Sequence, residues 1–145
     1  MNYEAPSFAH SFRDLVVHRK ARELAKDVFD FTLTLPKNDE FSLKDQVRRA
    51  SRSIGAQIAE AWAKRRYEKH FVSKLTDGDA EQMEVQHWMD ICLDCGFLKQ
   101  ADYQEFIERL EEINRLLHGM INKANMFCTN SPDTLHEATE EYFTA

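Results

Sequence analysis

The sequence predicts an all-α protein: an antiparallel up-and-down four-helix bundle that can carry a short extra C-terminal helix. Apolar residues recur at steps of three and four along separate stretches of the chain, which is the spacing of amphipathic helices. No stretch alternates between apolar and polar residues for long enough to indicate a β-strand. Only four glycines and three prolines interrupt the 145 residues, so we expect short connections, which place successive helices antiparallel.

Length and composition favour a single domain with a loosely held start and an acidic end. We expect a flexible segment at residues 1–11, the four-helix bundle at 12–127 and an acidic tail at 128–145. No apolar run approaches the roughly 20 residues that span a bilayer, so no membrane partner is expected. Three cysteines without a framework spacing predict reduced thiols and a cytoplasmic protein.

The first helix is expected to follow Phe12 and to end before Pro36. Its apolar residues alternate steps of four and three, as in a helix that faces the core of a bundle. They are Val17, Ala21, Leu24, Val28, Phe31 and Leu35. Pro36 ends the helix because proline disfavours the helical conformation in the residue before it.

The second helix is expected to run from Ser42, as its N-cap, to about Lys64 or Arg66. It carries two neighbouring stripes of residues at helical spacing. The apolar stripe consists of Val47, Ala50, Ile54, Ile58 and Ala61, and the second stripe consists of Arg48, Arg52, Gly55 and Ala59. Small residues let a neighbouring backbone approach closely, and guanidinium groups bind carboxylates or phosphates. This helix is therefore expected to contact more than one neighbour.

The third helix has a less regular apolar pattern. Its apolar residues are Phe71, Val72, Leu75, Met83, Trp88, Ile91, Cys92 and Cys95. Gly78 in its interior predicts a close contact with a neighbouring helix. Gly96 is a favourable residue for the turn that ends it.

The fourth helix is expected to begin at a capping-box-like pair, Asp102 and Glu105. Its apolar residues again follow steps of three and four: Tyr103, Phe106, Leu110, Ile113, Leu117, Met120 and Ala124. Beyond Cys128 the pattern stops. Leu135, Ala138 and Tyr142 have the spacing of a short terminal helix.

Several segments in this order resemble one known family. The segment 12–21 is similar to its opening, and Gln46-Val47-Arg48-Arg49-Ala50, Ser53-Ile54 and Ile58-Ala59-Glu60 are similar to its second-helix signature. Phe71, Leu75 and Gly78-Asp79-Ala80-Glu81 resemble the third helix, and Cys95-Gly96-Phe97-Leu98 resembles the segment after it. The family is the S23-like one, the four-helix-bundle proteins encoded in intervening sequences of bacterial large-subunit ribosomal RNA genes. The resemblance covers about residues 12–123.

This resemblance implies a bundle assembled as a ring, commonly a homopentamer, with no catalytic residues. It also implies relatedness to the accessory protein of diversity-generating retroelements, which binds a reverse transcriptase and nucleic acid. Two motifs depart from the family pattern. Gln57 and Ala61 stand where the family usually has Asn and Gly around Ile-Ala-Glu, and Asp79 stands where it usually has Ser.

Charge is distributed unevenly along the chain, whose formal net charge is −6. Residues 42–76 carry nine Lys or Arg against three Asp or Glu, whereas residues 77–145 carry four against fifteen. Two explanations are open: a nucleic-acid surface on the basic part, or pairing of basic with acidic helices, within one subunit or between subunits. Pairing is favoured because overall acidity opposes non-specific attraction to phosphate.

The candidate residues for an interface or a nucleic-acid site come from this basic part. They are Arg48, Arg49, Arg52, Glu60, Lys64, Arg65, Arg66 and Lys69. The three arginines of the second helix either form a phosphate-binding strip with the basic residues that follow, or pair with acidic residues. The acidic candidates are Asp77, Asp79, Glu81 and Glu84, and pairing is favoured. Glu60 is expected to be buried at a helix contact, where it accepts hydrogen bonds from an arginine or from backbone groups.

No cofactor and no metal site is predicted. Cys92 and Cys95 have the C-x-x-C spacing, but no second pair completes a zinc site, so core packing is expected for both. Glu84 and His87 give a single Glu-x-x-His spacing, whereas di-metal bundles use two. His87 and His118 can meet across the third and fourth helices, but no histidine has a helical partner histidine.

Three functions from different classes are considered. The favoured one is a non-enzymatic, homo-oligomeric scaffold or interaction module, a pentamer by the resemblance, in which a basic face meets the next subunit's acidic face. The alternative is an accessory protein that binds RNA or DNA, together with a nucleic-acid enzyme such as a reverse transcriptase. A metal-dependent bundle enzyme is the least favoured.

Overall fold

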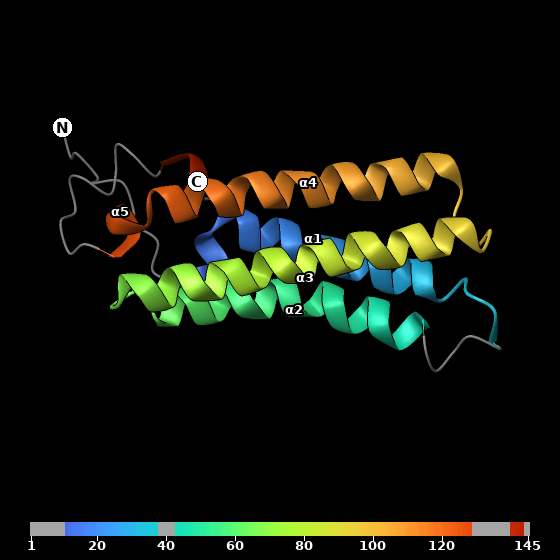
Figure 1. Ribbon diagram of the computed structural model, residues 1–145, viewed down its shortest axis with the longest axis horizontal. Helices are drawn as coiled ribbons and strands as arrows, with labels where there is room; N and C mark the ends of the chain where they lie inside the picture. Colours follow the sequence, from blue (N-terminus) through green and yellow to red (C-terminus); the bar gives the residue numbers. More distant parts are fainter. Residues whose placement is uncertain (1–10, 38–42, 129–139, 144–145) are drawn as a thin grey trace, which may run out of the picture.

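The computed structural model describes residues 11–37, 43–128 and 140–143. Over these ranges the chain forms four long helices and no strand (Figure 1). They are α1 (Val16–Thr32), α2 (Leu43–Ala63), α3 (Glu68–Asp94) and α4 (Gln100–Asn122). A short helix, α5 (Ala124–Cys128), and the single turns η1 (Phe12–Asp14) and η3 (Glu140–Tyr142) complete the described elements. The predicted all-α bundle is confirmed, and its short extra helix, α5, precedes the segment of Leu135, Ala138 and Tyr142 in which the sequence predicts one.

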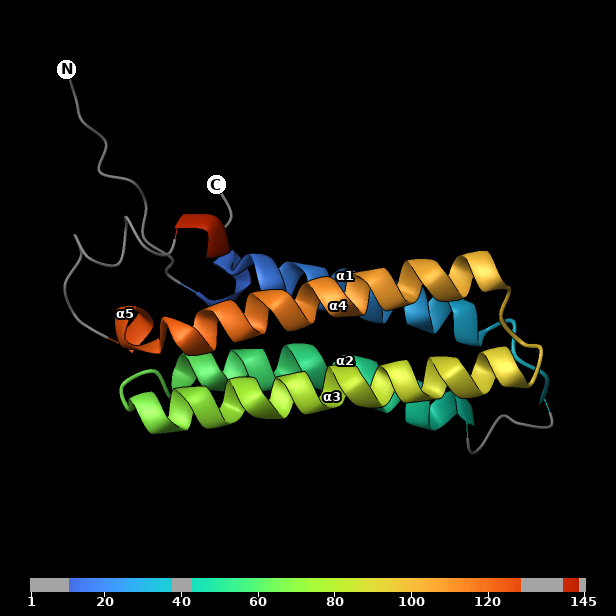
Figure 2. The ribbon, with the colours of Figure 1, turned by 45° about the horizontal axis from the view of Figure 1, so that its top comes forward.

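Successive helices run antiparallel and lie in two layers, α1 beside α4 and α2 beside α3 (Figure 2). The α2–α3 connection, α5 and η3 lie at one end of the bundle, and the end of α1, the start of α2 and the α3–α4 connection lie at the other (Figure 1). We refer to these as the α2–α3 end and the α3–α4 end. No described helix contains a stretch that is long and apolar enough to cross a membrane.

The apolar stripes of α1, α2 and α4 form the core, as predicted. All five residues of the α2 stripe are fully buried, and so are Leu24 and Val28 of α1 and Leu110 and Leu117 of α4. Burying one such large aliphatic side chain contributes about 1.5–3 kcal/mol. These buried stripes therefore contribute strongly to the stability of the bundle.

The first helix ends earlier than Pro36 predicts. After Thr32 the chain tightens into i→i+3 turns, in which the Thr34 and Leu35 amides donate to Phe31 and Thr32 at 2.9 and 3.2 Å. Leu35 is still buried, because these turns keep the chain against the core. The expected N-cap of the next helix, Ser42, lies outside the described residues.

The apolar pattern predicted for α3 is partly wrong. Met83 is 54% exposed and Cys95 is also exposed, whereas Gly78, Asp79 and Gln82 are buried. Gly78 does lie close to α2: a Cβ there would be 3.6 Å from Gln57 Cβ, which is an ordinary contact distance. Polar and small residues therefore replace apolar ones in the middle of α3.

Gly96 ends α3 as predicted. Its φ is +75°, a conformation that favours glycine. The Phe97 amide donates to the Cys92 carbonyl at 2.9 Å and the Gly96 amide donates to the Leu93 carbonyl at 3.0 Å. This pair of hydrogen bonds is the Schellman motif that closes many helices.

The capping box predicted for α4 is wrong. The helix begins at Gln100 with Lys99 as its N-cap, and no side chain caps it. Asp102 instead lies in the first turn, where its carboxylate interacts favourably with the positive end of the helix dipole.

Residues 140–143 pack on the bundle at the α2–α3 end. Tyr142 is buried against Phe127, and the Phe143 ring lies 6.3 Å from the Trp62 ring. Gly119 leaves room for Tyr142, since a Cβ there would overlap the Tyr142 hydroxyl. Of the predicted terminal helix, Leu135 and Ala138 lie outside the described residues, as do most of the flexible segment and of the acidic tail.

Candidate functional site

The predicted arginines of α2 lie on two different sides of the helix. Arg48 donates from Nε to Thr32 Oγ1 at 2.7 Å, and its guanidinium lies 4.5 Å from the centre of the Phe29 ring of α1. Arg52 lies over the same ring at 5.8 Å. Within the described residues, no carboxylate forms an ion pair with either arginine.

Two large apolar side chains are exposed beside these arginines. Phe29 is 36% exposed and Leu33 is 60% exposed, and both lie on the side of α1 that adjoins α2. Arg22, two turns before Phe29 and three turns before Leu33 on the same side of α1, is exposed as well. We call this set the arginine–phenylalanine surface, defined by Arg22, Phe29, Leu33, Arg48 and Arg52.

Arg49 faces α3, where it forms the predicted type of pair. Its guanidinium binds Glu84 and lies 3.5 Å from Glu81 Oε2. Burial raises the pKa of the Glu81 carboxyl, and Arg49 opposes this shift while neighbouring Glu84 adds to it. Since Arg49 points to α3 while Arg48 and Arg52 point to α1, one continuous basic strip along α2 does not form.

Glu60 is not buried, contrary to the expectation. Its side chain is 53% exposed and pairs with Lys74 of α3 at 2.9 Å, rather than with an arginine or a backbone group. The hydrogen bond from Lys74 lowers the pKa of the Glu60 carboxyl. Arg49 and Glu60 therefore both form ion pairs across the α2–α3 seam.

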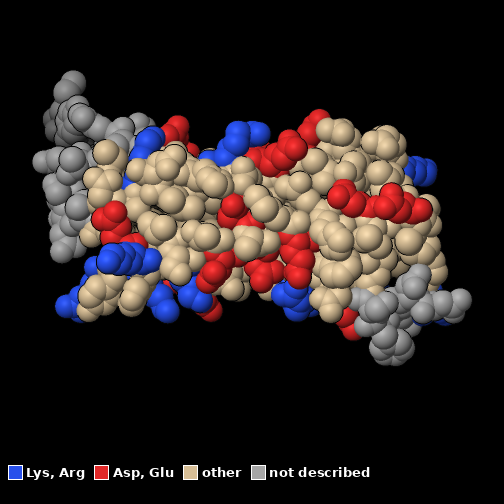
Figure 3. All heavy atoms as spheres, in the orientation of Figure 1, with Lys and Arg blue, Asp and Glu red and all other residues tan. Residues whose placement is uncertain are grey.

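The remaining basic candidates gather at the α2–α3 end. We call this group the basic end, defined by Lys64, Arg65, Arg66 and Lys69 (lower left in Figure 3). The Arg65 side chain is fixed against Trp62, because it donates to the Trp62 carbonyl at 2.9 Å and its guanidinium lies 4.1 Å from the centre of the Trp62 ring. Tyr67 is 58% exposed between the other members.

A buried polar cluster, which the sequence patterns do not reveal, joins α3 to α4. Asp79 accepts hydrogen bonds from Gln82 Nε2 at 3.0 Å, Asn114 Nδ2 at 2.7 Å and His118 Nε2 at 3.0 Å. Gln86 donates to Gln82 at 2.8 Å. His118 therefore meets Asp79, whereas His87, its suggested partner, packs on the Trp88 ring.

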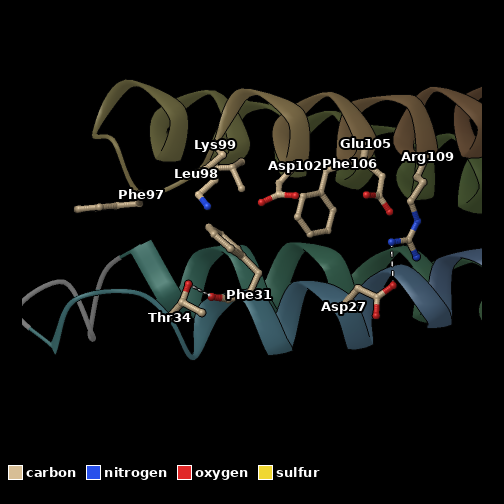
Figure 4. Close-up of a pocket in the computed structure, with 10 residues that line it drawn as sticks. All are labelled: Asp27, Phe31, Thr34, Phe97, Leu98, Lys99, Asp102, Glu105, Phe106 and Arg109. Carbon is tan, nitrogen blue, oxygen red and sulfur yellow. Dashed lines mark hydrogen bonds and ion pairs between the residues drawn. The ribbon is translucent and has the colours of Figure 1, made fainter.

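A pocket lies between the end of α1 and the start of α4, at the α3–α4 end (Figure 4). It has a volume of about 470 Å³ and contains the rings of Phe31, Phe97 and Phe106. Asp102 and Glu105 of α4 line it, and the Arg109–Asp27 ion pair of 2.8 Å crosses it (Figure 4).

A second hollow of about 440 Å³ continues along α4, lined by Glu105, Glu108, Arg109, Glu111, Glu112 and Arg115. Acidic atoms spread over the visible face of α3 and α4 in Figure 3. Because α1 and α4 pack less closely than the other neighbouring helices, this side of the bundle stays hollowed. We call the carboxylates of Asp102, Glu105 and Glu108, with the pocket beside them, the acidic groove.

The two cysteines of the C-x-x-C spacing differ in their exposure to solvent. Cys92 is buried as expected, and burial raises the pKa of its thiol to about 11. Cys95 is exposed, so its predicted core packing is wrong. Over the described residues, no group of three or more His, Cys, Asp or Glu side chains could hold a metal ion. Glu84 of the Glu-x-x-His spacing instead binds Arg49.

Comparison with known proteins gives a family and similar solved structures. The sequence matches the family described as 23S rRNA-intervening sequence protein over residues 13–119. The fold is similar to a protein of unknown function from the S23 ribosomal protein family of Bacteroides thetaiotaomicron VPI-5482. The two chains are 27% identical with a TM-score of 0.67, over 74% of this chain and 96% of that one. No curated protein matches the sequence.

Proposed function

This chain belongs to the 23S rRNA-intervening sequence protein family, and we propose that it is a non-enzymatic interaction module that assembles with copies of itself. The expected assembly is a closed ring, with five as the expected number of subunits, an expectation that rests on the family resemblance. A scaffold role is supported by the shape of the described chain, a rod whose sides carry charged side chains (Figure 1 and Figure 3).

The arginine–phenylalanine surface is the observation that carries this proposal. Phe29 and Leu33 are exposed, and the two arginines beside them have no acidic partner in the described chain. Aromatic residues and arginine are enriched where proteins bind each other, because they combine large contact area with directed hydrogen bonds. A second copy of this acidic chain would supply the carboxylates that these arginines lack.

Light scattering after size-exclusion chromatography tests the proposal. At low salt we expect a mass several times that of the 17.0 kDa chain, and at high salt a lower mass, because salt screens exposed charge pairs. A monomer at micromolar concentration and low salt would refute self-assembly. A multimer whose mass does not change with salt concentration would show that charge pairs do not stabilise the assembly.

A second candidate function, binding of RNA or DNA in support of a nucleic-acid enzyme, is favoured by the basic end. Lys64, Arg66 and Lys69 are exposed there without a carboxylate partner among the described residues, and exposed Tyr67 lies between them. Lys and Arg bind the phosphate backbone, and an exposed aromatic ring can stack on an unpaired base.

Fluorescence anisotropy with a labelled single-stranded oligonucleotide tests this second candidate. Arg66→Ala with Lys69→Ala should weaken binding and lower the slope of log K against log salt by about 1.4, since each phosphate contact contributes about 0.7 for single strands. The matched control, Arg19→Ala with Lys26→Ala on α1, removes two exposed charges elsewhere and should change little. Equal binding by both variants would contradict this candidate.

A further inference from the structure

We infer that the arginine–phenylalanine surface of one copy docks on the acidic groove of the next copy. This inference rests on the self-assembly proposed above and names the two surfaces that make it. The two surfaces are different patches of the same chain, so the contact is heterologous. Each copy therefore binds one neighbour through its arginine–phenylalanine surface and the other neighbour through its acidic groove.

The arginine–phenylalanine surface is already in a binding conformation. Arg48 is held by the 2.7 Å hydrogen bond to Thr32 and by its position above the Phe29 ring, and Arg52 shares that ring. A guanidinium held in this way loses little rotamer freedom when it binds a carboxylate. Leu33, 60% exposed, adds apolar area beside the two charges.

The acidic groove offers the complementary chemistry. Asp102, Glu105 and Glu108 follow one another at steps of three along α4, and none of them pairs with a cation of the described chain. Their neighbours are already neutralised, since Glu112 pairs with Lys20 at 3.0 Å and Asp27 with Arg109 at 2.8 Å. The pocket beside them, walled by phenylalanine rings, can receive an apolar side chain.

A contact between two copies of the same surface is disfavoured by charge repulsion. Two arginine–phenylalanine surfaces would bring six guanidinium groups together, and two acidic grooves would bring six carboxylates together. Such like-charge contacts cost several kcal/mol, so a symmetric dimer through either surface is disfavoured. The charges therefore select the heterologous contact.

The placement of the two surfaces favours a closed ring. The arginine–phenylalanine surface follows the α1–α2 seam, and the acidic groove follows the α1–α4 seam. The two surfaces therefore lie on adjacent sides of the bundle with α1 between them (Figure 2). Adjacent seams of a four-helix bundle point about 90° apart, and a ring of four or five copies needs about 90–110° between contact directions. Contacts on opposite sides would instead produce a filament. In this ring α1 faces the centre.

Mixing two non-assembling variants tests the inference. The first variant carries Arg48→Gln with Arg52→Gln, and the second carries Asp102→Asn, Glu105→Gln and Glu108→Gln. Each keeps one intact surface, so each alone should run as a 17.0 kDa monomer. Their equimolar mixture should form a one-to-one dimer and nothing larger, because only one productive contact exists between them. Circular dichroism confirms that each variant is folded.

The controls separate this inference from the proposed function. Lys64→Gln with Arg66→Gln removes two charges from the basic end and should leave the multimer intact. A multimeric wild type whose two surface variants still assemble would overturn the inference and leave self-assembly standing. Folded monomeric variants that stay monomeric when mixed would also overturn it. A monomeric wild type would overturn both.

Discussion

Asp79 is a carboxylate inside the bundle, and its partners explain how a charge is tolerated there. It accepts hydrogen bonds from side chains three, 35 and 39 positions away. A buried charge that has several donors avoids most of the penalty of leaving water. No periodic pattern links residues so far apart in sequence, which is why Asp79 is expected from the sequence to be a surface partner of an arginine.

Removing this carboxylate should destabilise the bundle. Asp79→Ala leaves buried Gln82 and partly buried Asn114 without their acceptor, so we expect a loss of about 2 kcal/mol in the free energy of unfolding. Urea denaturation measures it. Asp77→Ala, an exposed carboxylate on the same helix, is the control and should change stability by less than about 0.5 kcal/mol. Equal effects of the two substitutions would contradict the role given to Asp79.

His18 should make the protein less stable in mild acid. Burial first, and then the charges of Arg22 and Arg13, lower the pKa of its imidazole in the folded state. The unfolded chain therefore binds a proton at higher pH than the folded one, and stability falls as the pH drops below about 6.5.

Unfolding by urea at pH 7.5 and pH 5.5 measures this effect. The His18→Gln variant should lose less stability between the two values than the wild type does. His70→Gln replaces an exposed histidine and should behave like the wild type. A His18→Gln variant with unchanged pH dependence would show that His18 does not contribute.

Among the elements, α2 is the one whose sequence predicts its surroundings best. Its apolar stripe faces the core as predicted, because a 3.6-residue period carries over directly into the faces of a helix. Its second stripe contacts a further neighbour, as expected, and the structure identifies that neighbour as α1. The predictions for α3 are poorer, since its buried face includes Gly78, Asp79 and Gln82, which do not read as apolar. The predicted start of α4 is wrong by a few residues, because Lys99 precedes it without a side-chain cap.

The candidate site is predictable only in part. Sequence identifies the charged residues, and Arg49 pairs with two of its suggested partners. It does not reveal that Arg48 and Arg52 share the Phe29 ring, because that depends on the angle at which α1 and α2 pack. The sequence does not predict the acidic groove for the same reason, because the groove depends on the loose packing of α1 against α4.

The fit of η3 on α4 gives a prediction at this scale. Gly119→Ala would place a Cβ where the Tyr142 hydroxyl lies, so Tyr142 must move. Alanine favours a helix interior by about 1 kcal/mol over glycine, and this gain offsets much of the lost packing. We therefore expect little change in the melting temperature but faster hydrogen exchange at residues 140–143. Unchanged exchange there would contradict the packing of Tyr142 on Gly119.

On the scale of the whole molecule, charge and exposure separate onto different sides of one rod. Arginines and exposed apolar residues follow the α1–α2 seam, carboxylates follow α4, and lysines and arginines gather at the α2–α3 end. The apolar core lies inside this rod, and the arginine–phenylalanine surface and the acidic groove lie outside it. The proposed self-assembly would use the arginine–phenylalanine surface and the acidic groove at once.

The solution mass of the unmodified protein at low salt tests this central claim most directly. Self-assembly into a ring predicts one species with a mass close to a whole multiple of 17.0 kDa, with five as the expected multiple. A single 17.0 kDa species at micromolar concentration would contradict the claim. The exposed arginines of α2 would then be available to another partner, and nucleic acid would become the leading candidate.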